Sequence, residues 1–447
     1  MSIATQRAER ADRFRAAYLD QAAALAPTLP GHGVGWLDRR RARAAERFAE
    51  IGFPSRRDEA WTFTDPRPLT RAVLAPAPKR ANGVDKTALS RFLPAGVEAH
   101  LVVFVDGHFR ADLSALDDLP EGVRLGGLAA TLTVAPDCMK RVLDHDADAA
   151  DSGPVALNAA LAADGAVLRI ADGVALARPI AFLYLASGAP AAMHLRNVVV
   201  AGGGARASLI EVYGALGDAA YWTNAVTDLQ VADGASIAHL RIQGEAPAAF
   251  HLAATRARLG MKGAYRRFAL TLGGRLARDE VSARIEGEDG DCRLDGLYLG
   301  RDRQHLDTTT VIDHLAPGGA SGEHYKGVVD DRARGVFQGR IVVHPDAQGT
   351  DAHQLAKALL LSETAEIDTK PELEINADDV KCSHGAAAGE IDADALFYLR
   401  ARGIDAERAR HMLIGAFADE VIERVAEPAL RAHVHDLAAS WLASAGG

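Results

Sequence analysis

The sequence is poor in cysteine and has no cluster of basic residues, and each shortage excludes a class of protein. Its 447 residues include three cysteines, Cys138, Cys292 and Cys382. They are too few and too scattered to form a disulfide framework. The formal net charge is −10, from 50 basic and 60 acidic residues. Because phosphate backbones are bound by clustered lysine and arginine, nucleic acid is not expected as a partner.

Long apolar runs and nucleotide-binding loops are also missing. The chain has no stretch of about 18 apolar residues, so no helix is expected to cross a membrane. Its first residues are charged (Arg7, Glu9, Arg10) and do not resemble the apolar core of a secretory signal. With so little cysteine, this predicts a soluble protein of the reducing cytoplasm. No Gly-x-x-x-x-Gly-Lys-Ser/Thr motif occurs, so we expect no intrinsic ATP site of the P-loop type.

The N-terminal part of the sequence is typical of α-helices. Apolar residues recur at helical spacing at Phe14, Tyr18, Ala22 and Leu25. A second helix is predicted from Trp36 to Glu50, with Gly52 as its C-terminal stop. A proline-rich connection through Pro66 and Pro78 follows. These features predict a helical region over residues 1–95.

Between residues 96 and 388 the sequence changes to short apolar runs separated by glycine-containing turns. The turn glycines recur about every 30 residues, at Gly173, Gly204, Gly234, Gly263, Gly290 and Gly319. In one run Phe337, Gly339, Ile341 and Val343 fall on one face of a strand, with Gln338 and Arg340 on the other. A repeat of this length built from strands favours a parallel β-helix, in which each turn buries its neighbour. A sandwich of two sheets is the alternative.

Residues 389–447 return to helical patterns. Asp392 is expected to cap a helix that runs to Arg402, Asp405 to cap a second, and Pro428 to open a third. The second helix carries an apolar stripe, predicted at Ala409, Met412, Leu413, Ala416, Phe417 and Val421. About 60 residues are too few for a large core of their own. We therefore expect these helices to cap the solenoid, to dock a partner, or both.

The stretch from Lys370 to Gly385 holds the strongest candidate site. On an extended strand Cys382 and His384 share one face with Val380, because successive side chains alternate. A thiol and an imidazole about 7 Å apart can converge on one metal ion. They supply two ligands, whereas a closed zinc site has four. The site is therefore incomplete or is completed by another chain, unless Cys382 is simply a buried thiol and His384 a structural histidine.

The remaining candidates have weaker patterns. We expect Cys138 and Cys292 to be core thiols. Asp330 and Asp331 invite comparison with the acid/base pairs of β-helix carbohydrate-active enzymes, but neighbours on a strand would face opposite ways. Five histidines that precede the motif follow no metal-ligand spacing and are expected to be structural or solvated: His305, His314, His324, His344 and His353.

Several stretches resemble the SufB/SufD family of iron–sulfur cluster assembly proteins. The resemblance is dense over about 100 residues, includes Lys-Cys-Ser-His-Gly around Cys382, and is weaker upstream at Arg56–Thr64. Ala387 and Ala388 replace a Thr-Val common in the family. The matching stretches are His324–Val343, Asp346–Gln354, Leu359–Glu366, Thr369–Gly385 and Phe397–Ile404.

The resemblance implies a mainly β fold, with a right-handed parallel β-helix between N-terminal and C-terminal α-helical regions. Length and low cysteine content are closer to the SufD branch than to SufB, the alternative paralogue. A SufD-like chain would be a scaffold and not an enzyme, in a complex with a SufB-like paralogue and a SufC-like ABC ATPase.

In that complex Cys382 and His384 would lie at the paralogue interface and contact a transient iron–sulfur cluster. The C-terminal helices would dock the ATPase. Exposed solenoid edges could also form a homodimer when the paralogue is absent. The helix residues expected at the ATPase contact are Phe397, Met412, Leu413 and Phe417.

Overall fold

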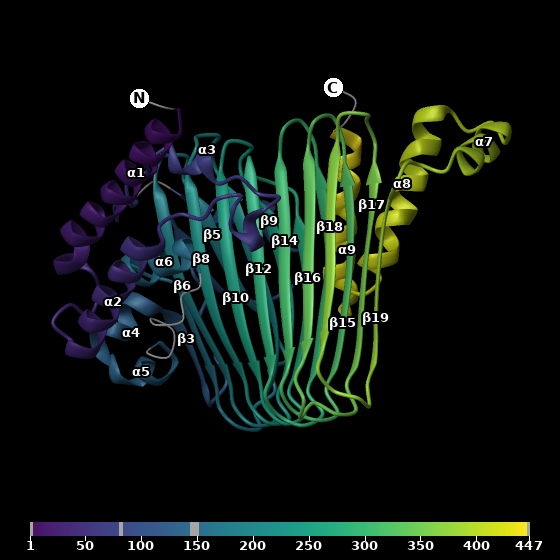
Figure 1. The fold of residues 1–447 in the computed structure, drawn as a ribbon. Helices are drawn as coiled ribbons and strands as arrows, with labels where there is room; N and C mark the ends of the chain where they lie inside the picture. The colour runs from purple at the N-terminus through teal and green to yellow at the C-terminus, as the bar shows by residue number, and fades with distance from the viewer. Residues whose placement is uncertain (1–2, 80–83, 144–151, 445–447) are drawn as a thin grey trace.

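Two parallel β-sheets that face each other form the body of the protein (Figure 1). The computed structural model describes residues 3–79, 84–143 and 152–444. After the first strands the chain alternates between the sheets and advances one strand in each sheet per turn. The result is a β-solenoid of about 8 turns flanked by helices at both ends of the sequence. This confirms the predicted parallel β-helix and excludes the sandwich alternative.

The two sheets are built from alternate strands of the sequence. The ten-stranded sheet has the order β19-β17-β15-β13-β11-β9-β7-β5-β1-β2, and the nine-stranded sheet the order β18-β16-β14-β12-β10-β8-β6-β4-β3. Among the described strands, β1–β2 and β3–β4 pair antiparallel and the other pairs are parallel.

The strands of the ten-stranded sheet are β1 (His100–Val105), β2 (His108–Phe109), β5 (Ile180–Ala186), β7 (Arg206–Ala215), β9 (Ser236–Gly244), β11 (Ala264–Thr271), β13 (Asp291–Gly300), β15 (Ala320–Val329), β17 (Asp351–Leu360) and β19 (Lys381–Gly389). Those of the nine-stranded sheet are β3 (Val123–Gly127), β4 (Ala166–Ile170), β6 (Ala192–Ala201), β8 (Trp222–Val231), β10 (Phe250–Leu259), β12 (Leu276–Ile285), β14 (His305–His314), β16 (Arg334–Val343) and β18 (Glu366–Ile375). The helices are α1 (Ile3–Leu25), α2 (Gly35–Ile51), α3 (Arg67–Thr70), α4 (Leu128–Val134), α5 (Asp137–Leu143), α6 (Gly153–Leu161), α7 (Ala393–Ala401), α8 (Ala406–Ile422) and α9 (Pro428–Ala443).

The recurring glycines allow the turns to form for two reasons, backbone conformation and close packing. Gly204 and Gly234 have φ of +67°, a conformation that glycine adopts without strain. In later turns Lys262 and Asp289 take the positive φ instead. Gly290, which directly follows Asp289, lies so close to Ile285 that a Cβ there would stand 2.7 Å from its methyl group. The repeat seen in the sequence therefore reflects close packing as well as backbone conformation.

The main core fills the space between the two sheets. Phe337, Ile341 and Val343 are fully buried there, as their alternation predicts. Charged groups are buried among the apolar layers, and they are paired. His239 lies 2.8 Å from Glu211, and Arg267 lies 2.6 Å from Asp279. Such pairing is required because an isolated buried charge is costly.

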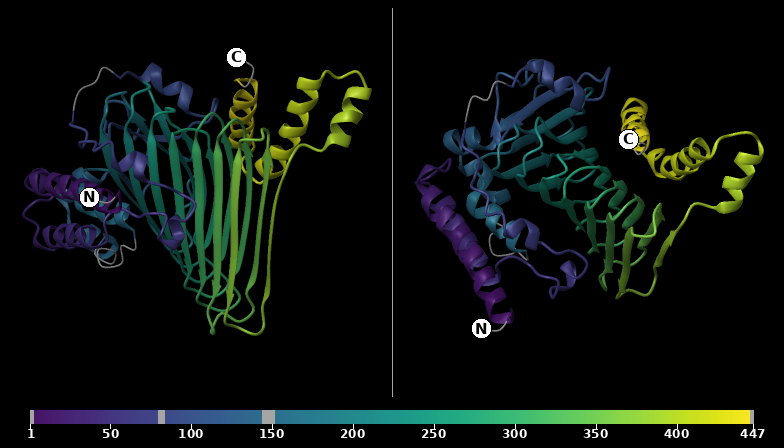
Figure 2. Two further views of the ribbon diagram at one scale, coloured as in Figure 1. Left: turned by 45° about the horizontal axis from the view of Figure 1, so that its top comes forward. Right: turned by 90° about the horizontal axis from the view of Figure 1, so that it is seen from above.

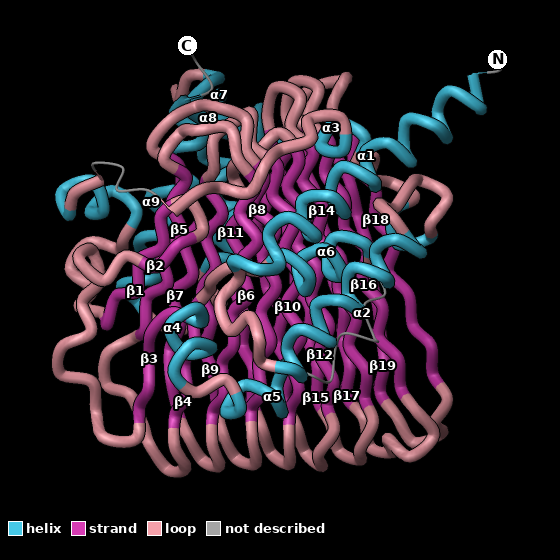
Figure 3. Tube along the Cα trace, turned by 90° about the vertical axis from the view of Figure 1, so that its left-hand side faces the viewer, coloured by secondary structure: helices cyan, strands magenta, loops and turns pink. Residues whose placement is uncertain are grey.

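The N-terminal helices cover the outer face of the nine-stranded sheet (Figures 2 and 3). Tyr18 of α1 and Phe48 of α2 pack in one cluster with Trp222 of β8. Helices α4, α5 and α6 belong to this layer, although they fall within residues 96–388 of the sequence. Strand β1 begins at His100 and α7 at Ala393. The domain limits predicted at 95 and 388 stay a prediction.

The C-terminal helices α8 and α9 pack on the outer face of the other sheet (Figure 2). The predicted caps are confirmed, because Asp392 and Asp405 each accept hydrogen bonds from backbone amides of the following helix. Pro428 is the first residue of α9. No helix in the described ranges is long and apolar enough to cross a membrane.

Candidate functional site at the open end of the solenoid

The solenoid ends in two strands whose outer edges are unpaired. Strand β19 is the last of the ten-stranded sheet and pairs with β17, and β18 is the last of the nine-stranded sheet and pairs with β16 (Figure 1). The residues of both strands are partly or fully exposed. A free edge presents a row of backbone donors and acceptors that another strand can pair with.

Cys382 and His384 lie side by side on this edge strand. Cys382 is in register with Ala352 of β17, and His384 with Gln354. Cys382 is partly buried and packs against the core between the sheets, as Val380 does, whereas His384 is exposed. The strand predicted for this stretch is confirmed, and so is the shared face of the two side chains.

The intervening residue, Ser383, faces the other way. Its hydroxyl lies 2.7 Å from Nδ1 of His353, on the outer surface of the ten-stranded sheet. Nε2 of His353 lies 2.7 Å from Asp351. The outer face of β19 thus has hydrogen-bonding partners in its own chain, while the inner face with Cys382 and His384 opens at the end of the solenoid.

The thiol of Cys382 is held in its protonated form. Burial raises the pKa of Cys382 above its ordinary value of 9.0, and the carboxylate of Asp351 acts in the same direction, while a hydrogen bond with the Ala352 backbone opposes them. Because the thiolate is the form that binds metals, ligation by Cys382 must be coupled to loss of this proton. A metal ion or a cation supplied by a partner would favour that loss.

We expect the alkylation of the three thiols to differ sharply in the isolated protein. Cys138 is exposed and should react with iodoacetamide first, and Cys292, which is buried and whose pKa is raised by burial, should not react in the native state. The alkylation rate of Cys382 should continue to increase as the pH is raised beyond 9, because the raised pKa of this thiol leaves little thiolate below that pH. Mass spectrometry of timed samples measures each site, and a rate at Cys382 that levels off below pH 8.5 would contradict the burial effect.

The residues in register with His384 on the neighbouring strands lie in the core. Gln354 on β17 is in register with His384, and Glu323 on β15 is in register with Gln354. Both inner side chains are buried, and the Gln354 amide donates a hydrogen bond to the Glu323 carboxylate. Along the sequence, each of the three residues is about one solenoid turn from the next. The repeat length, rather than any local motif, is the signal that links them.

Glu323 makes the stability of this end of the solenoid depend on pH. Burial raises its pKa from 4.5 to about 7, against the opposing effect of the donor Gln354. Since the folded-state pKa lies above the unfolded value, stability is highest below pH 4.5 and falls as pH rises through about 7. Glu323→Gln should therefore raise the free energy of unfolding by about 3 kcal/mol at pH 8 and by less than about 1 kcal/mol at pH 5. Denaturant titrations at both pH values test this, and an equal effect at the two would contradict it.

The described residues contain no group of three or more histidine, cysteine, aspartate or glutamate side chains placed to hold a metal ion. Among the described residues, Cys382 and His384 are therefore a pair of candidate ligands without a third acidic, cysteine or histidine side chain placed to join them. An iron–sulfur cluster usually takes four, and histidine can replace some of the cysteines. A cluster held here would need ligands beyond those that the described residues place together.

Two expectations for other residues are wrong. Cys138 is exposed on the short helix α5, and only Cys292 is a core thiol. Asp330 and Asp331 lie in the turn between β15 and β16, not on a strand, and Asp331 has φ of +52°. Their carboxylates accept hydrogen bonds from backbone amides of the turns, at 2.9 and 3.0 Å. Both carboxylates therefore take part in the hydrogen bonding of turns.

The five histidines His305, His314, His324, His344 and His353 are spread over the solenoid, as expected. His305 and His314 are bonded to hydroxyl groups, and His324 and His344 each lie near one aspartate. His353 contacts Ser383, as described above.

Helix α7 and the start of α8 project past the solenoid and expose apolar side chains. Helix α7 has no buried residue, and α7 with the start of α8 lies away from the sheets (Figure 1). Phe397 and Tyr398 are 74% and 56% exposed, and Met412 is 47% exposed. The exposed side of α7 and the start of α8 that carries these three residues is called the α7–α8 surface.

The core-facing side of α8 differs from the predicted stripe. Ala409 and Val421 are buried as predicted, but Met412 and Ala416 are exposed, and Ile414, Ala418 and Ile422 face the core instead. Leu413 and Phe417 are half-buried. The stripe was misplaced because α8 is apolar on more than one side, and only the sheet decides which side is covered.

Phe417 is part of the contact between α8 and the solenoid. The ammonium group of Lys326 on β15 lies 4.1 Å from the centre of its ring and donates a 2.8 Å hydrogen bond to its carbonyl oxygen. The same group forms an ion pair with Glu420. Lys326 is buried, so its charge needs these partners.

Two family models match the chain over most of its length. The SufBD protein N-terminal region matches residues 13–182. The SufBD core domain of SUF-system iron–sulfur cluster assembly matches residues 184–417, which includes the solenoid turns, α7 and most of α8.

Curated relatives align with the chain nearly from end to end. An iron–sulfur cluster assembly SufBD family protein of Synechocystis sp. is 33% identical over 399 residues, covering 86% of this chain and 87% of the relative. The iron–sulfur cluster assembly protein SufD of Escherichia coli is 30% identical over 398 residues, covering 87% and 89%. The chloroplastic protein ABCI7 of Arabidopsis thaliana is 32% identical over 404 residues, covering 87% and 82%.

Proposed function

Because the chain belongs to the SufBD family of iron–sulfur cluster assembly proteins, we propose that it is a SufD-like scaffold subunit without catalytic activity of its own. The observation that carries the proposal is the open end of the solenoid, where Cys382 and His384 lie on an unpaired edge strand. The identity to E. coli SufD along most of both chains supports the SufD-like assignment.

The free edges of β18 and β19 favour pairing with a SufB-like paralogue. Strand addition would extend both sheets across the interface through main-chain hydrogen bonds, which need no particular side chains. The inner faces of the two solenoids would then meet at Cys382 and His384. The paralogue would supply the remaining ligands, and the iron–sulfur cluster would be assembled there as cargo, with the proton of Cys382 released on ligation. The same edge could pair with a second copy of this chain when the paralogue is absent.

The α7–α8 surface favours docking of a SufC-like ABC ATPase. Phe397 and Met412 offer exposed apolar area on helices that project from the solenoid, and such area is typical of a protein interface. The sequence has no P-loop, so ATP would be bound by the partner. Movement of α8 would reach β15 through the contact of Lys326 with Phe417 and Glu420. For this to act on the cluster, the interface must have two arrangements that ATP binding favours differently.

Anaerobic purification of the tagged chain from its own cells tests the proposal. We expect an ABC-type ATPase and a β-solenoid paralogue to co-purify and to be identified by mass spectrometry. Phe397→Asp with Met412→Asp should remove the ATPase and retain the paralogue, because both side chains lie in the α7–α8 surface. Recovery of the chain without the paralogue, when both partners are co-produced in excess, would rule out the scaffold role.

A further inference from the structure

A cavity of about 530 Å³ lies where three strands of the nine-stranded sheet begin, next to the segment that joins α2 to α3. Leu276 of β12, His305 of β14 and Arg334 of β16 are in register there and form one row of its wall. Its volume is within the range of about 300–1,000 Å³ that is typical of small-molecule sites. None of the residues that line it is adjacent in sequence to a segment outside the described ranges. Cys382 and His384 are not among them, so this cavity is distinct from the open end of the solenoid.

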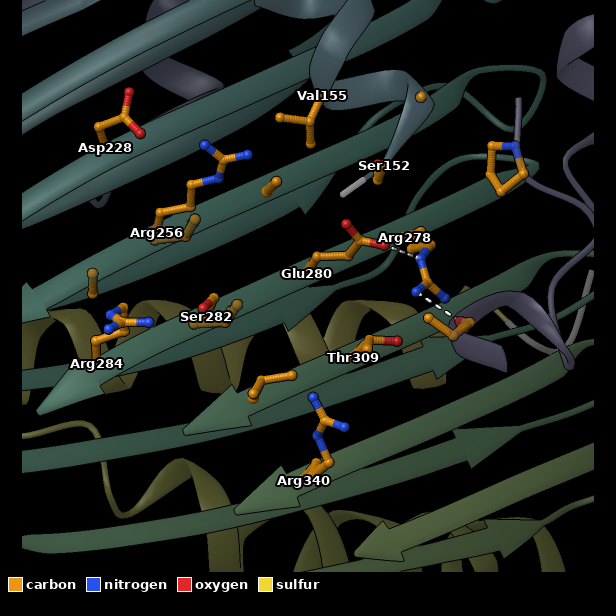
Figure 4. A pocket seen from close by; sticks show the side chains of 18 of the residues that line it. Ser152, Val155, Asp228, Arg256, Arg278, Glu280, Ser282, Arg284, Thr309 and Arg340 are labelled. Atoms are coloured by element: carbon orange, nitrogen blue, oxygen red, sulfur yellow. Dashed lines mark hydrogen bonds and ion pairs between the residues drawn. The ribbon is translucent and has the colours of Figure 1, made fainter. Parts of the chain in front are cut away.

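Hydrogen bonds between the α2–α3 segment and the sheet fix the wall of the cavity. The hydroxyl oxygen of Thr64 lies 2.7 Å from Nε2 of His305, and the hydroxyl group donates to the carboxylate of Asp307 on β14. Arg278 of β12 is paired with the same carboxylate and donates a 2.9 Å hydrogen bond to the carbonyl oxygen of Ala60. Arg278 also lines another cavity, of about 630 Å³, farther along the same strands (Figure 4). Because these contacts hold the segment against the sheet, the wall needs no ligand to form.

Part of the lining is apolar. Phe63 and Pro68 come from the α2–α3 segment and the start of α3, Pro247 from the turn between β9 and β10, and Leu276 from β12. His305 adds an uncharged ring at neutral pH, because burial lowers its pKa from 6.5 to about 4. An apolar or aromatic group of a ligand would be removed from water by contact with these side chains, which favours binding.

Two exposed arginines of the lining have no partner within the described ranges. Arg275 directly precedes β12, and Arg303 lies in the turn before β14. Their guanidinium groups form neither an ion pair nor a hydrogen bond with any residue that the structure describes. The two segments lie side by side, because the amide of His305 donates a 3.0 Å hydrogen bond to the carbonyl oxygen of Arg275. The cavity is therefore lined by two guanidinium groups, from adjacent segments, to which no described carboxylate is bound.

The other charged groups of the lining each interact with a further charged residue. Their interactions do not involve Arg275 or Arg303, so these two arginines keep their charge available to a ligand. The interactions are those of Asp65 with Arg67 (2.7 and 2.8 Å) and with Arg56, of Arg334 with Asp368 (2.6 Å) and Glu366 (3.6 Å), and of Asp302 with Arg301.

We propose that this cavity binds a small phosphate monoester with an apolar or aromatic body. Each guanidinium group can donate two parallel hydrogen bonds, and the three terminal oxygens of a phosphate monoester suit two such groups better than the two oxygens of a carboxylate. Arg275 and Arg303 would hold the phosphate, and the body would lie against Phe63 and Pro247. Only binding is proposed, not a reaction. The proposal does not depend on the scaffold function.

Isothermal titration of the full-length chain with phenyl phosphate, inorganic phosphate, benzoate and phenol tests the site. We expect phenyl phosphate to bind most tightly, because it alone combines the phosphate group with an aromatic body, and phenol not to bind. Binding of benzoate as tight as that of phenyl phosphate would show that the site does not prefer phosphate. Binding of inorganic phosphate as tight as that of phenyl phosphate would show that the apolar lining does not contact the ligand. Either result would overturn the proposal.

Two double variants separate this site from general attraction to positive charge. Arg275→Gln with Arg303→Gln should weaken the binding of phenyl phosphate at least tenfold, and both residues are exposed, so the chain should still fold.

Arg57→Gln with Arg332→Gln is the matched control, because it also removes two exposed arginines, neither of which lines the cavity. Arg332 lies two residues before Arg334, the position that Arg303 has before His305 one turn earlier. The control should change the affinity less than twofold, and the melting temperature of each variant shows whether it is folded. Equal weakening by the two double variants, or no change on loss of Arg275 and Arg303, would overturn the proposal.

Discussion

Replacing Ala386 and Ala388 by proline is expected to weaken association with a SufB-like partner about 100-fold while leaving the solenoid folded. The Lys381 amide donates to the Thr350 carbonyl at 2.8 Å, toward β17. Alternate amides of a strand point to opposite sides, so the amides of Ala386 and Ala388 point to the free edge. Proline removes these two donors and leaves the acceptors of the incoming strand unpaired, whereas it removes no hydrogen bond within the chain.

The control for this variant is Ala386→Ser with Ala388→Ser, which alters the same side chains and keeps both amides. Affinity would be measured by titration of the paralogue, and folding by the melting temperature, which should stay within about 3 °C of the wild type. If the proline variant binds as tightly as the serine control, then β19 does not pair with the partner, and the interface must be sought elsewhere.

His384→Ala is expected to lower the iron and sulfide content of the anaerobically assembled complex by about tenfold or more, with the subunits still associated. The imidazole of His384 is exposed at the open end and supports no core packing, so its loss should not destabilise the chain. Cys382→Ala should lower cluster content similarly. The double variant should be little worse than either single variant, because a site that has lost one ligand gains little from the other.

Ser383→Ala is the matched control for both, because Ser383 lies between them but faces His353 on the outer surface. It should leave the cluster content unchanged. The readouts are iron and sulfide per complex, together with gel filtration to show that the complex persists. Full cluster content in both His384→Ala and Cys382→Ala would show that this chain contributes no ligand, and that the partner holds the cluster alone.

Local features of the sequence predicted much of this architecture. The apolar alternation around Phe337 indicates a strand, and Asp392, Asp405 and Pro428 mark helix starts because capping depends on the next three residues only. The period of about 30 residues indicates a solenoid, since each turn repeats the same local pattern. The spacing of Cys382 and His384 places them on one face of any strand.

Only the tertiary structure could decide which side of each helix is buried, because that depends on the element packed against it. Cys138 is exposed because α5 turns it away from the core, and α8 buries Ile414 instead of Met412 because the sheet covers that side. Local propensity does not determine either choice.

The same reason explains why the candidate site at the open end and the cavity at the start of β12, β14 and β16 differ in how much of each could be predicted. Cys382 and His384 are two residues apart, so a local strand brings them together, and the sequence by itself determined their shared face. Gln354 and Glu323 join their row only through the register of β19, β17 and β15. Leu276, His305 and Arg334 lie far apart in sequence, and only parallel strands stacked about 4.8 Å apart place them in one row beside a cavity. Strand register is a long-range property, and the tertiary structure alone decided it.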